Sequence, residues 1–158
     1  MYAADPVSAL PDPAMKPEFY DGVGTKRLIA WGLDVLLVLI LATLVFVITI
    51  VPLALTIFGI FLLPAIMGMI GFFYRWITLS SGSATWGMRM MSIQLREDDG
   101  GRLSTSTAFF HTVGYMLSFA VTIVQIASVV MMATSERGQG LSDMVLGTAM
   151  INRPAAGW

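Results

Sequence analysis

Three residues at the start of a long apolar stretch have the types and the spacing to do chemistry together. In the segment RLIAWGLD, Arg27, Trp31 and Asp34 are spaced by four and three residues, which places them on one face of a helix. Asp34 then lies about 10 Å further along the helix axis than Arg27. A carboxylate near the centre of a membrane helix costs roughly 2.5 to 3.5 kcal/mol, so it needs a partner, a cavity or a proton. We favour a hydrogen-bonded aspartate that fixes the register of the helix, with an ion, proton or ligand site as the alternative.

A second polar pattern lies in the last long apolar stretch. Spacings of four, three, four and three predict one polar helix face, formed by His111, Tyr115, Ser118, Thr122 and Gln125. Gly114 and Ser118 form a small-xxx-small pair, which favours the close approach of another helix. Hydroxyl and amide groups of this kind more often form interhelical hydrogen bonds than a translocation path. His111 is the single histidine of the chain and its one candidate for handling a proton.

The remaining side chains give no support for catalysis or metal binding. The chain has no cysteine, which excludes disulfides, thiolate catalysis and cysteine-ligated metal. With one histidine and no carboxylate near it on the same helix, we expect no metal site. No nucleophile and base pair, zinc motif or nucleotide-binding loop is present, so we expect neither an enzyme nor a cofactor. A net charge of −1 gives no indication of nucleic-acid binding.

The elements that must position these residues are membrane helices. Hydrophobic residues make up 56% of the 158-residue chain and charged residues only 12%, about half the charged fraction of a soluble domain. Asp34 is the one charged residue between Leu28 and Tyr74, a stretch long enough for two helices of about 20 residues. A third apolar stretch, residues 108–133, is long enough to span once.

Proline and glycine positions set the expected helix boundaries. Pro52 is best placed at a turn, which predicts helices at about 27–50 and 54–76. The second helix contains Pro64, Gly68 and Gly71, and we expect the two glycines to let the first two helices pack closely. The third hydrophobic helix, 108–133, is either a plain span or a re-entrant segment that bends near Gly114 to Ser118.

The middle of the chain is the main segment outside the membrane. Between residues 83 and 106, Met91, Ile93 and Leu95 alternate with polar residues, and Asp98 to Gly101 has strong turn chemistry. This pattern predicts a short β-hairpin, to which residues 145–151 could add a strand. Residues 1–25, rich in proline, are expected to form a flexible tail, and residues 152–158 a second tail. The expected fold is therefore an all-α integral membrane protein with a transmembrane hairpin, a third hydrophobic helix and a small cytoplasmic β-hairpin.

Orientation follows from the basic residues in short loops. Lys16, Lys26 and Arg27 precede the first helix, and residues 75–107 add four arginines on the same side of a two-helix hairpin: Arg75, Arg89, Arg96 and Arg102. That side, with the N-terminus, is expected to be cytoplasmic. A plain third span would carry Asp143 to the outside, whereas a bent one would return it to the side of Arg27. We favour the second arrangement, in which Arg27 and Asp143 pair and residues 145–151 meet the strand at 91–95.

Three segments together resemble the RDD family of membrane proteins, named for one arginine and two aspartates. RLIAWGLD at 27–34, SATWGMRMMSIQL at 83–95 and GLSDMVLGTAMI at 140–151 look like its first-helix, middle and closing motifs. The resemblance covers about residues 26–151, taken as one RDD-like membrane domain. It implies that Arg27, Asp34 and Asp143 are the name-giving residues and that the chain lies in a bacterial inner membrane. Met88, His111 and Ser142 stand where the family often has basic residues.

Two classes of function remain open, because the family has no settled biochemical activity. We favour a helper or structural subunit that packs against other membrane proteins, since one chain is too small for the paired repeats of typical carriers. The alternative is an oligomeric transporter, or a transport component, for an ion or small solute that uses Asp34. The expected partners are the lipid bilayer and other membrane proteins or copies of the same chain.

Overall fold

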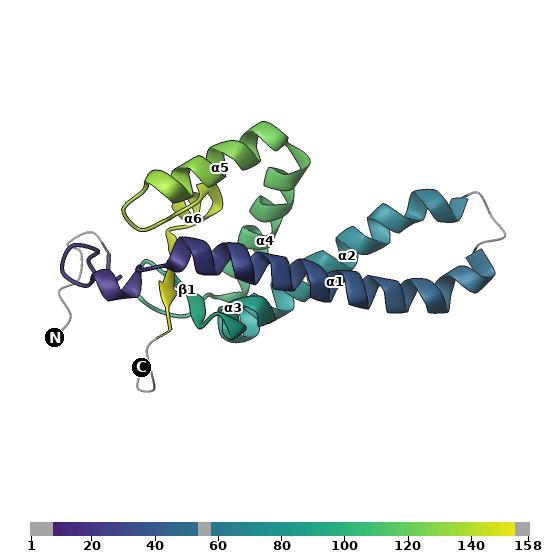
Figure 1. Cartoon of the computed structure of the whole chain (residues 1–158), viewed down its shortest axis with the longest axis horizontal. Helices are drawn as coiled ribbons and strands as arrows, with labels where there is room; N and C mark the ends of the chain where they lie inside the picture. The colour runs from purple at the N-terminus through teal and green to yellow at the C-terminus, as the bar shows by residue number, and fades with distance from the viewer. Residues whose placement is uncertain (1–7, 54–57, 154–158) are drawn as a thin grey trace.

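A computed structural model shows a long helical hairpin whose polar end is covered by shorter helices and a small sheet (Figure 1). It describes residues 8–53 and 58–153, and the side chains of residues 49–53 and 58–63 lie outside the described part. Helix α1 (Val23–Leu53) and helix α2 (Phe58–Gly82) form the hairpin. The first and last described segments of the chain, purple and yellow in Figure 1, lie at the end of the hairpin where helix α1 begins. The protein is thus mostly helical and has one polar and one apolar end.

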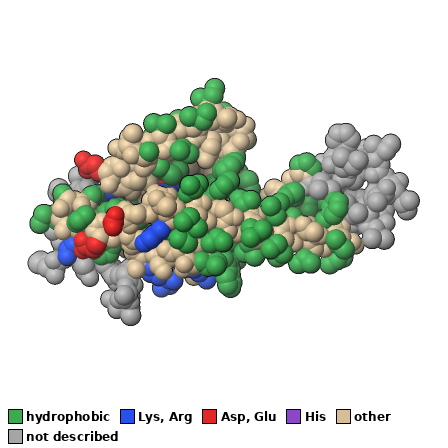
Figure 2. Space-filling view, in the orientation of Figure 1, with side chains coloured by type: hydrophobic (Ala, Val, Ile, Leu, Met, Phe, Trp, Pro, Cys, Tyr) green, Lys and Arg blue, Asp and Glu red, His purple; other side chains and the backbone are tan. Residues whose placement is uncertain are grey.

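Apolar residues cover the hairpin on several sides. Residues 17–48 form a helical segment long and apolar enough to cross a membrane by length and composition, with few of its side chains buried inside the molecule. Figure 2 shows hydrophobic side chains along the hairpin and charged ones gathered at the opposite end of the molecule. A surface helix of a soluble protein would instead be apolar on one stripe only. This distribution fits the membrane-helix expectation for the first apolar stretch.

The boundaries of the hairpin helices differ from those expected. Helix α1 begins four residues earlier than predicted, includes Pro52 and ends at Leu53, while α2 continues past residue 76 to Gly82. The predicted start of the second helix at residue 54 lies outside the described residues. Pro64 lies inside α2. The extra turns at the polar end carry the contacts that hold that end together.

Helix α3 (Trp86–Met90) follows α2 after a short turn and is fixed at its start by Thr85. The Thr85 hydroxyl accepts a hydrogen bond from the amide of Met88 at 3.3 Å, as an N-cap residue does. Ser83, in the turn, has a φ of 54°, and its hydroxyl accepts a hydrogen bond from the amide of Leu103. The turn is therefore tied both to α3 and to the later part of the segment.

The local β-hairpin predicted within residues 83–106 is wrong. Strand β1 (Ile93–Glu97) is followed by a turn, but the chain after the turn enters helix α4 (Thr105–Ala120). Ser104 is the N-cap of that helix, because its hydroxyl accepts from the amide of Thr107 at 3.1 Å. The residues after the turn offer no alternating apolar pattern, so they favour a helix start over a second strand.

The partner of β1 is the C-terminal strand β2 (Thr148–Asn152). The two strands are antiparallel, with Ile93 opposite Asn152 and Glu97 opposite Thr148. The pairing of the middle segment with the C-terminal apolar run is thus confirmed, with the register now defined. Buried residues of this sheet meet α1, α2 and α3 in the core, which contains Val23, Ala30, Leu79, Ala84, Met88, Ile93, Leu95, Leu103, Ala108 and Met150.

The third apolar stretch forms two helices instead of one. Helix α4 ends at Ala120, Val121 is extended, and helix α5 (Thr122–Thr134) leaves at an angle of 117° to α4. A straight helix over residues 108–133 is therefore wrong, and the bend lies after Ser118, not between Gly114 and Ser118. Kinks usually occur at proline or glycine, and neither is present at this position. The bend turns the chain back toward helix α6 (Leu141–Val145), which packs against α5 and α4.

The segment before α1 is packed, contrary to the expected flexible tail. Leu10 and Phe19 are buried, and the amide of Ala9 donates a hydrogen bond to the carbonyl of Asp98 at 2.7 Å. A short 3-10 helix (Pro17–Phe19) leads into α1. Asn152, expected in the C-terminal tail, belongs to β2 and contacts this segment through the carbonyl oxygens of Glu18 and Asp21. Residues 1–7 and 154–158 lie outside the described part.

The three glycines predicted at helix contacts behave differently. A side-chain carbon added at Gly68 would meet none of the described residues within 4 Å, so the described residues show no close contact at Gly68 itself. One added at Gly71 would reach Val38 of α1 and Met116 of α4 at ordinary contact distance. At Gly114 it would come within 2.7 Å of the Ser142 hydroxyl. Gly114 therefore permits a close approach, but of α6 and not of a long membrane helix.

Candidate functional site: two buried aspartates

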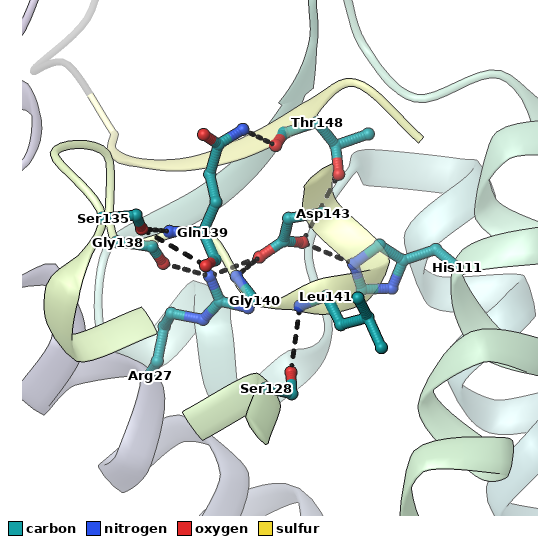
Figure 3. A network of polar contacts seen from close by, with 10 residues as sticks. All are labelled: Arg27, His111, Ser128, Ser135, Gly138, Gln139, Gly140, Leu141, Asp143 and Thr148. Carbon is teal, nitrogen blue, oxygen red and sulfur yellow. Dashed lines mark hydrogen bonds and ion pairs between the residues drawn. The ribbon is translucent and has the colours of Figure 1, made fainter. Parts of the chain in front are cut away.

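Asp143 is the centre of a buried polar network at the polar end of the molecule (Figure 3). Its Oδ2 is 2.7 Å from Nη1 of Arg27 on α1, and it accepts a hydrogen bond from the amide of Gly140 at 3.0 Å. Its Oδ1 lies 2.8 Å from Nε2 of His111 on α4 and 3.4 Å from the Thr148 hydroxyl on β2. We call these residues the Asp143 cluster: Arg27, His111, Gly140, Asp143 and Thr148. It joins α6 and β2 to α1 and α4, which are distant from them in sequence.

The Asp143 carboxylate is closed to solvent, and its partner Arg27 is mostly covered. The Asp143 side chain is 1% exposed and the Arg27 side chain 15%. Burial by itself raises the pKa of Asp143, but the Arg27 charge and the hydrogen bonds from His111 and Gly140 hold it well below its usual range. Asp143 is therefore a stable carboxylate that completes a buried ion pair.

The loop between α5 and α6 is shaped to present this carboxylate. Gly138 has a φ of +61°, a conformation that favours glycine, and its carbonyl accepts a second hydrogen bond from Arg27 at 3.0 Å. The Gln139 side chain donates to the carbonyl of Thr148 at 2.7 Å. The Ser128 hydroxyl of α5 accepts from the amide of Leu141 at 3.1 Å. The bend after α4 is what brings α5 and Ser128 to this position.

Asp34 forms a second buried cluster, with Tyr74, Thr85 and Gly87, two turns further along the same face of α1. Its Oδ1 accepts hydrogen bonds from the Tyr74 hydroxyl at 2.6 Å and from the Gly87 amide at 2.8 Å. Its Oδ2 accepts from the Thr85 hydroxyl at 2.5 Å. Asp34 is 7% exposed. This Asp34 cluster links α1 to α2 and α3 through uncharged donors, with no cation in contact among the described residues.

Gly87 is required for this contact. A side-chain carbon added there would collide with the carbonyl oxygen of Ala30 and with the Asp34 carboxylate. The middle motif of the sequence therefore fixes α3 against α1, because Thr85 and Gly87 at the start of α3 donate hydrogen bonds to the Asp34 carboxylate. The sequence interpretation missed Tyr74, Thr85 and Gly87 as partners of Asp34. The signal was present in the T-x-G spacing, which places a hydroxyl and a bare amide at one helix start.

The predicted polar face of the third stretch is only partly formed. His111 is buried in the Asp143 cluster, and the Tyr115 hydroxyl accepts from Nε1 of Trp31 at 2.9 Å. The Ser118 hydroxyl bonds the carbonyl of Gly114 within its own helix. Thr122 and Gln125 lie beyond the bend, on α5, so they do not continue the stripe. The predicted stripe assumed one straight helix, and the residue spacing no longer places side chains on one face beyond the bend.

The contacts in these two clusters hold the helices and the sheet in position. Among the described residues no group of three histidine, cysteine, aspartate or glutamate side chains could hold a metal ion. The histidine and aspartate are brought together by the fold, although they are 32 positions apart. No hydroxyl donates to His111 in the described part of the chain, so the pair lacks the nucleophile of a catalytic triad.

Comparison with protein families decides the relationship. The model of the RDD family matches residues 23–147. The chain belongs to the RDD family. The resemblance read from the three motifs is confirmed, and the RDD match begins at the first residue of α1 and ends just before β2. No curated protein and no solved structure matches the chain. As an RDD protein with an apolar helix it is membrane-associated.

By the motif resemblance, the RDD name refers to Arg27, Asp34 and Asp143. The structure brings the arginine and the second aspartate into an ion pair, as the same-side arrangement of the tail predicts. Asp34 lies two turns further along α1 and bonds a different set of residues. His111, which occupies a position where the family often has arginine, is the second partner of Asp143.

Proposed function

We propose that this RDD protein is a multi-pass inner-membrane protein that acts as a helper or structural subunit and packs against other membrane proteins. The observation that carries the proposal is that both buried aspartates have their hydrogen-bonding capacity used within the chain. Asp34 accepts three hydrogen bonds from neutral donors, and Asp143 is paired with Arg27 and His111. Such carboxylates fix the packing of helices, as in the structural interpretation of Asp34.

The rest of the hairpin gives little support to transport by a single chain. The hollow between α1 and α2 is lined by apolar side chains, among them Leu41, Ile66, Ile70 and Phe73. Solutes and ions need polar groups along their path. Large apolar side chains are also exposed on α5, including Ile123, Ile126 and Val130. In a membrane, surfaces of this kind contact lipid or another apolar protein surface.

In the proposed orientation the hairpin crosses the membrane twice and the polar end faces the cytoplasm. The N-terminal lysines and the arginines of the middle segment are then on the cytoplasmic side, as the distribution of basic residues favours. The contacts of β2 with β1 and of Asp143 with Arg27 support placing the C-terminal segment on the same side. The bent pair α4 and α5 would lie at the interface and not cross.

Accessibility of single cysteines in this cysteine-free chain tests the orientation. Cysteine at Glu136, an exposed position, should resist a membrane-impermeant thiol reagent in intact cells and react after permeabilisation. Cysteine at Thr56, between α1 and α2, is the matched control and should react in both conditions. Prompt labelling at position 136 in intact cells would contradict the proposed side.

Purification in mild detergent followed by native mass analysis tests the function. Stoichiometric co-purification with a larger membrane complex is the expected result. A self-oligomer whose stability depends on an ion would favour the transport alternative. In the same assay Asp34→Asn separates the two, because loss of ion or proton flux with full stability would indicate transport, and loss of assembly in a protein without flux would indicate a subunit.

A further inference from the structure

Arg75 of α2 is a cation at the junction of the helices that forms no ion pair with the described residues. Its guanidinium carbon lies 4.2 Å from the centre of the Tyr115 ring on α4. Its Nε is buried and has no hydrogen-bond partner among the described residues. No ion pair joins Arg75 to any carboxylate of the described residues, whereas Arg27, which is also partly buried, pairs with Asp143. Part of the Arg75 side chain still reaches the molecular surface.

The groups around Arg75 supply donors and no free acceptor carboxylate. The Tyr115 hydroxyl accepts from Trp31, and no described residue accepts the proton of that hydroxyl. Asp34 and Asp143 are the acids within electrostatic range of Arg75, but their oxygens are already bonded to the other members of their clusters. His111, one helical turn before Tyr115 on the same face of α4, also has an unpartnered ring nitrogen, Nδ1.

A guanidinium with a buried, unsatisfied N–H is costly unless an acceptor reaches it. Its planar fork of donors matches the oxygens of a phosphate or carboxylate. The Tyr115 ring lies beside it and Trp31 donates to the Tyr115 hydroxyl, and aromatic residues of this type sit at the level of lipid headgroups in membrane proteins. Phosphate is the anion that every phospholipid carries at that level, and basic pockets between membrane helices bind such headgroups.

We propose that Arg75, with the Tyr115 hydroxyl beside it, forms a binding site for a phosphate group at the junction of α1, α2 and α4. The oxygens of the phosphate accept hydrogen bonds from the Arg75 guanidinium and the Tyr115 hydroxyl. Its ordinary source is the headgroup of an anionic phospholipid, and inorganic phosphate has the same chemistry. The site is independent of the subunit proposal, because it uses neither aspartate.

The full chain in detergent provides the first test. Thermal unfolding is measured with added phosphatidylglycerol, with phosphatidylcholine and with inorganic phosphate. A rise of the midpoint with phosphatidylglycerol that exceeds the rise with phosphatidylcholine is expected from a lipid phosphate site. An alternative result is that millimolar inorganic phosphate raises the midpoint while sodium chloride at the same ionic strength does not. That result would assign the site to free phosphate. Equal midpoints in all conditions would overturn the proposal.

Variants then locate the site. Arg75→Gln should weaken retention of phosphatidylglycerol, measured by native mass spectrometry, by about tenfold, since a charge-assisted contact is removed. Arg102→Gln is the matched control, because Arg102 is an exposed arginine on the same polar end. Tyr115→Phe keeps the ring under Arg75 and removes only the hydroxyl, so it should give a smaller loss. Unchanged lipid retention in Arg75→Gln, or an equal loss in Arg102→Gln, would contradict the assignment.

Discussion

The two aspartate clusters solve the same physical problem in different ways. Asp34 and Asp143 are both buried, but Asp143 is balanced by the charge of Arg27 and by His111, whereas Asp34 is held by two hydroxyls and one amide. The Asp143 cluster joins parts of the chain more than 100 positions apart. The Asp34 cluster joins the two helices of the hairpin to the short helix that follows them.

Because their partners differ, the two carboxylates should respond differently to the loss of a partner. Removal of one member of a buried ion pair leaves an uncompensated charge in a medium that solvates it poorly. Removal of one neutral donor leaves a carboxylate that still has other hydrogen bonds. The Asp143 cluster should therefore be the more sensitive to substitution and to acid, and the Asp34 cluster the more sensitive to changes of shape.

The largest effect is expected for Asp143→Asn. The variant leaves the Arg27 guanidinium buried without a counter-charge, so the free energy of unfolding should fall by about 3 to 5 kcal/mol. Thermal or denaturant unfolding in detergent measures the change, with the exposed Glu136→Gln as control. The double variant with Arg27→Gln should lose less than the sum of the single variants. A strictly additive double variant would show that the pair is not coupled.

Acid should weaken the Asp143 cluster selectively. The pKa of Asp143 is lower in the folded state than in the unfolded chain, so its contribution is fully present above about pH 4 and is lost as the pH falls below that value. The unfolding midpoint of the parent should therefore drop from pH 6 to pH 3 by more than that of Asp143→Asn. Parallel pH profiles for the two proteins would contradict this origin of the acid sensitivity.

Gly87→Ala tests the shape requirement of the Asp34 cluster. The added carbon collides with the backbone of Ala30 and with the Asp34 carboxylate, which should cost roughly 1 to 3 kcal/mol of stability. Gly68→Ala is the matched control, because the added carbon meets no described residue, and it should leave stability unchanged or slightly raised. Equal effects of the two substitutions would remove the argument for a close contact at Gly87.

The smallest effect is expected for Asp34→Asn. The asparagine oxygen can still accept from Tyr74 and Gly87, and its amide can donate to the Thr85 hydroxyl, so the loss should be about 1 to 2 kcal/mol. Tyr74→Phe, which removes a single hydrogen bond, should have an effect of similar or smaller size. Unfolding in detergent measures both. A loss of stability for Asp34→Asn as large as that for Asp143→Asn would contradict this prediction. It would show that hydrogen bonds from neutral donors do not make a buried aspartate easier to replace.

Sequence reasoning reached the elements whose signals are local. Composition and the charge-free stretches predict membrane helices, and the alternation at Met91 to Leu95 predicts a strand. Hydrogen bonds within a helix depend on neighbours in sequence, so such patterns carry the information. The three motifs also placed the chain in its family and singled out Arg27, Asp34 and Asp143. The burial of Asp34 was expected from the cost of a charge in an apolar stretch.

Tertiary structure alone decided which partners these residues take. No proline or glycine marks the bend at Val121 in the sequence. The bend returns α5 and α6 to the polar end and places Asp143 between Arg27 and His111. The same return gives β1 a partner from the C-terminus in place of a local hairpin. Thr85 and Gly87 receive Asp34 because α3 packs against α1. Contacts between distant segments depend on the packing of many side chains at once. Local sequence patterns do not carry that information.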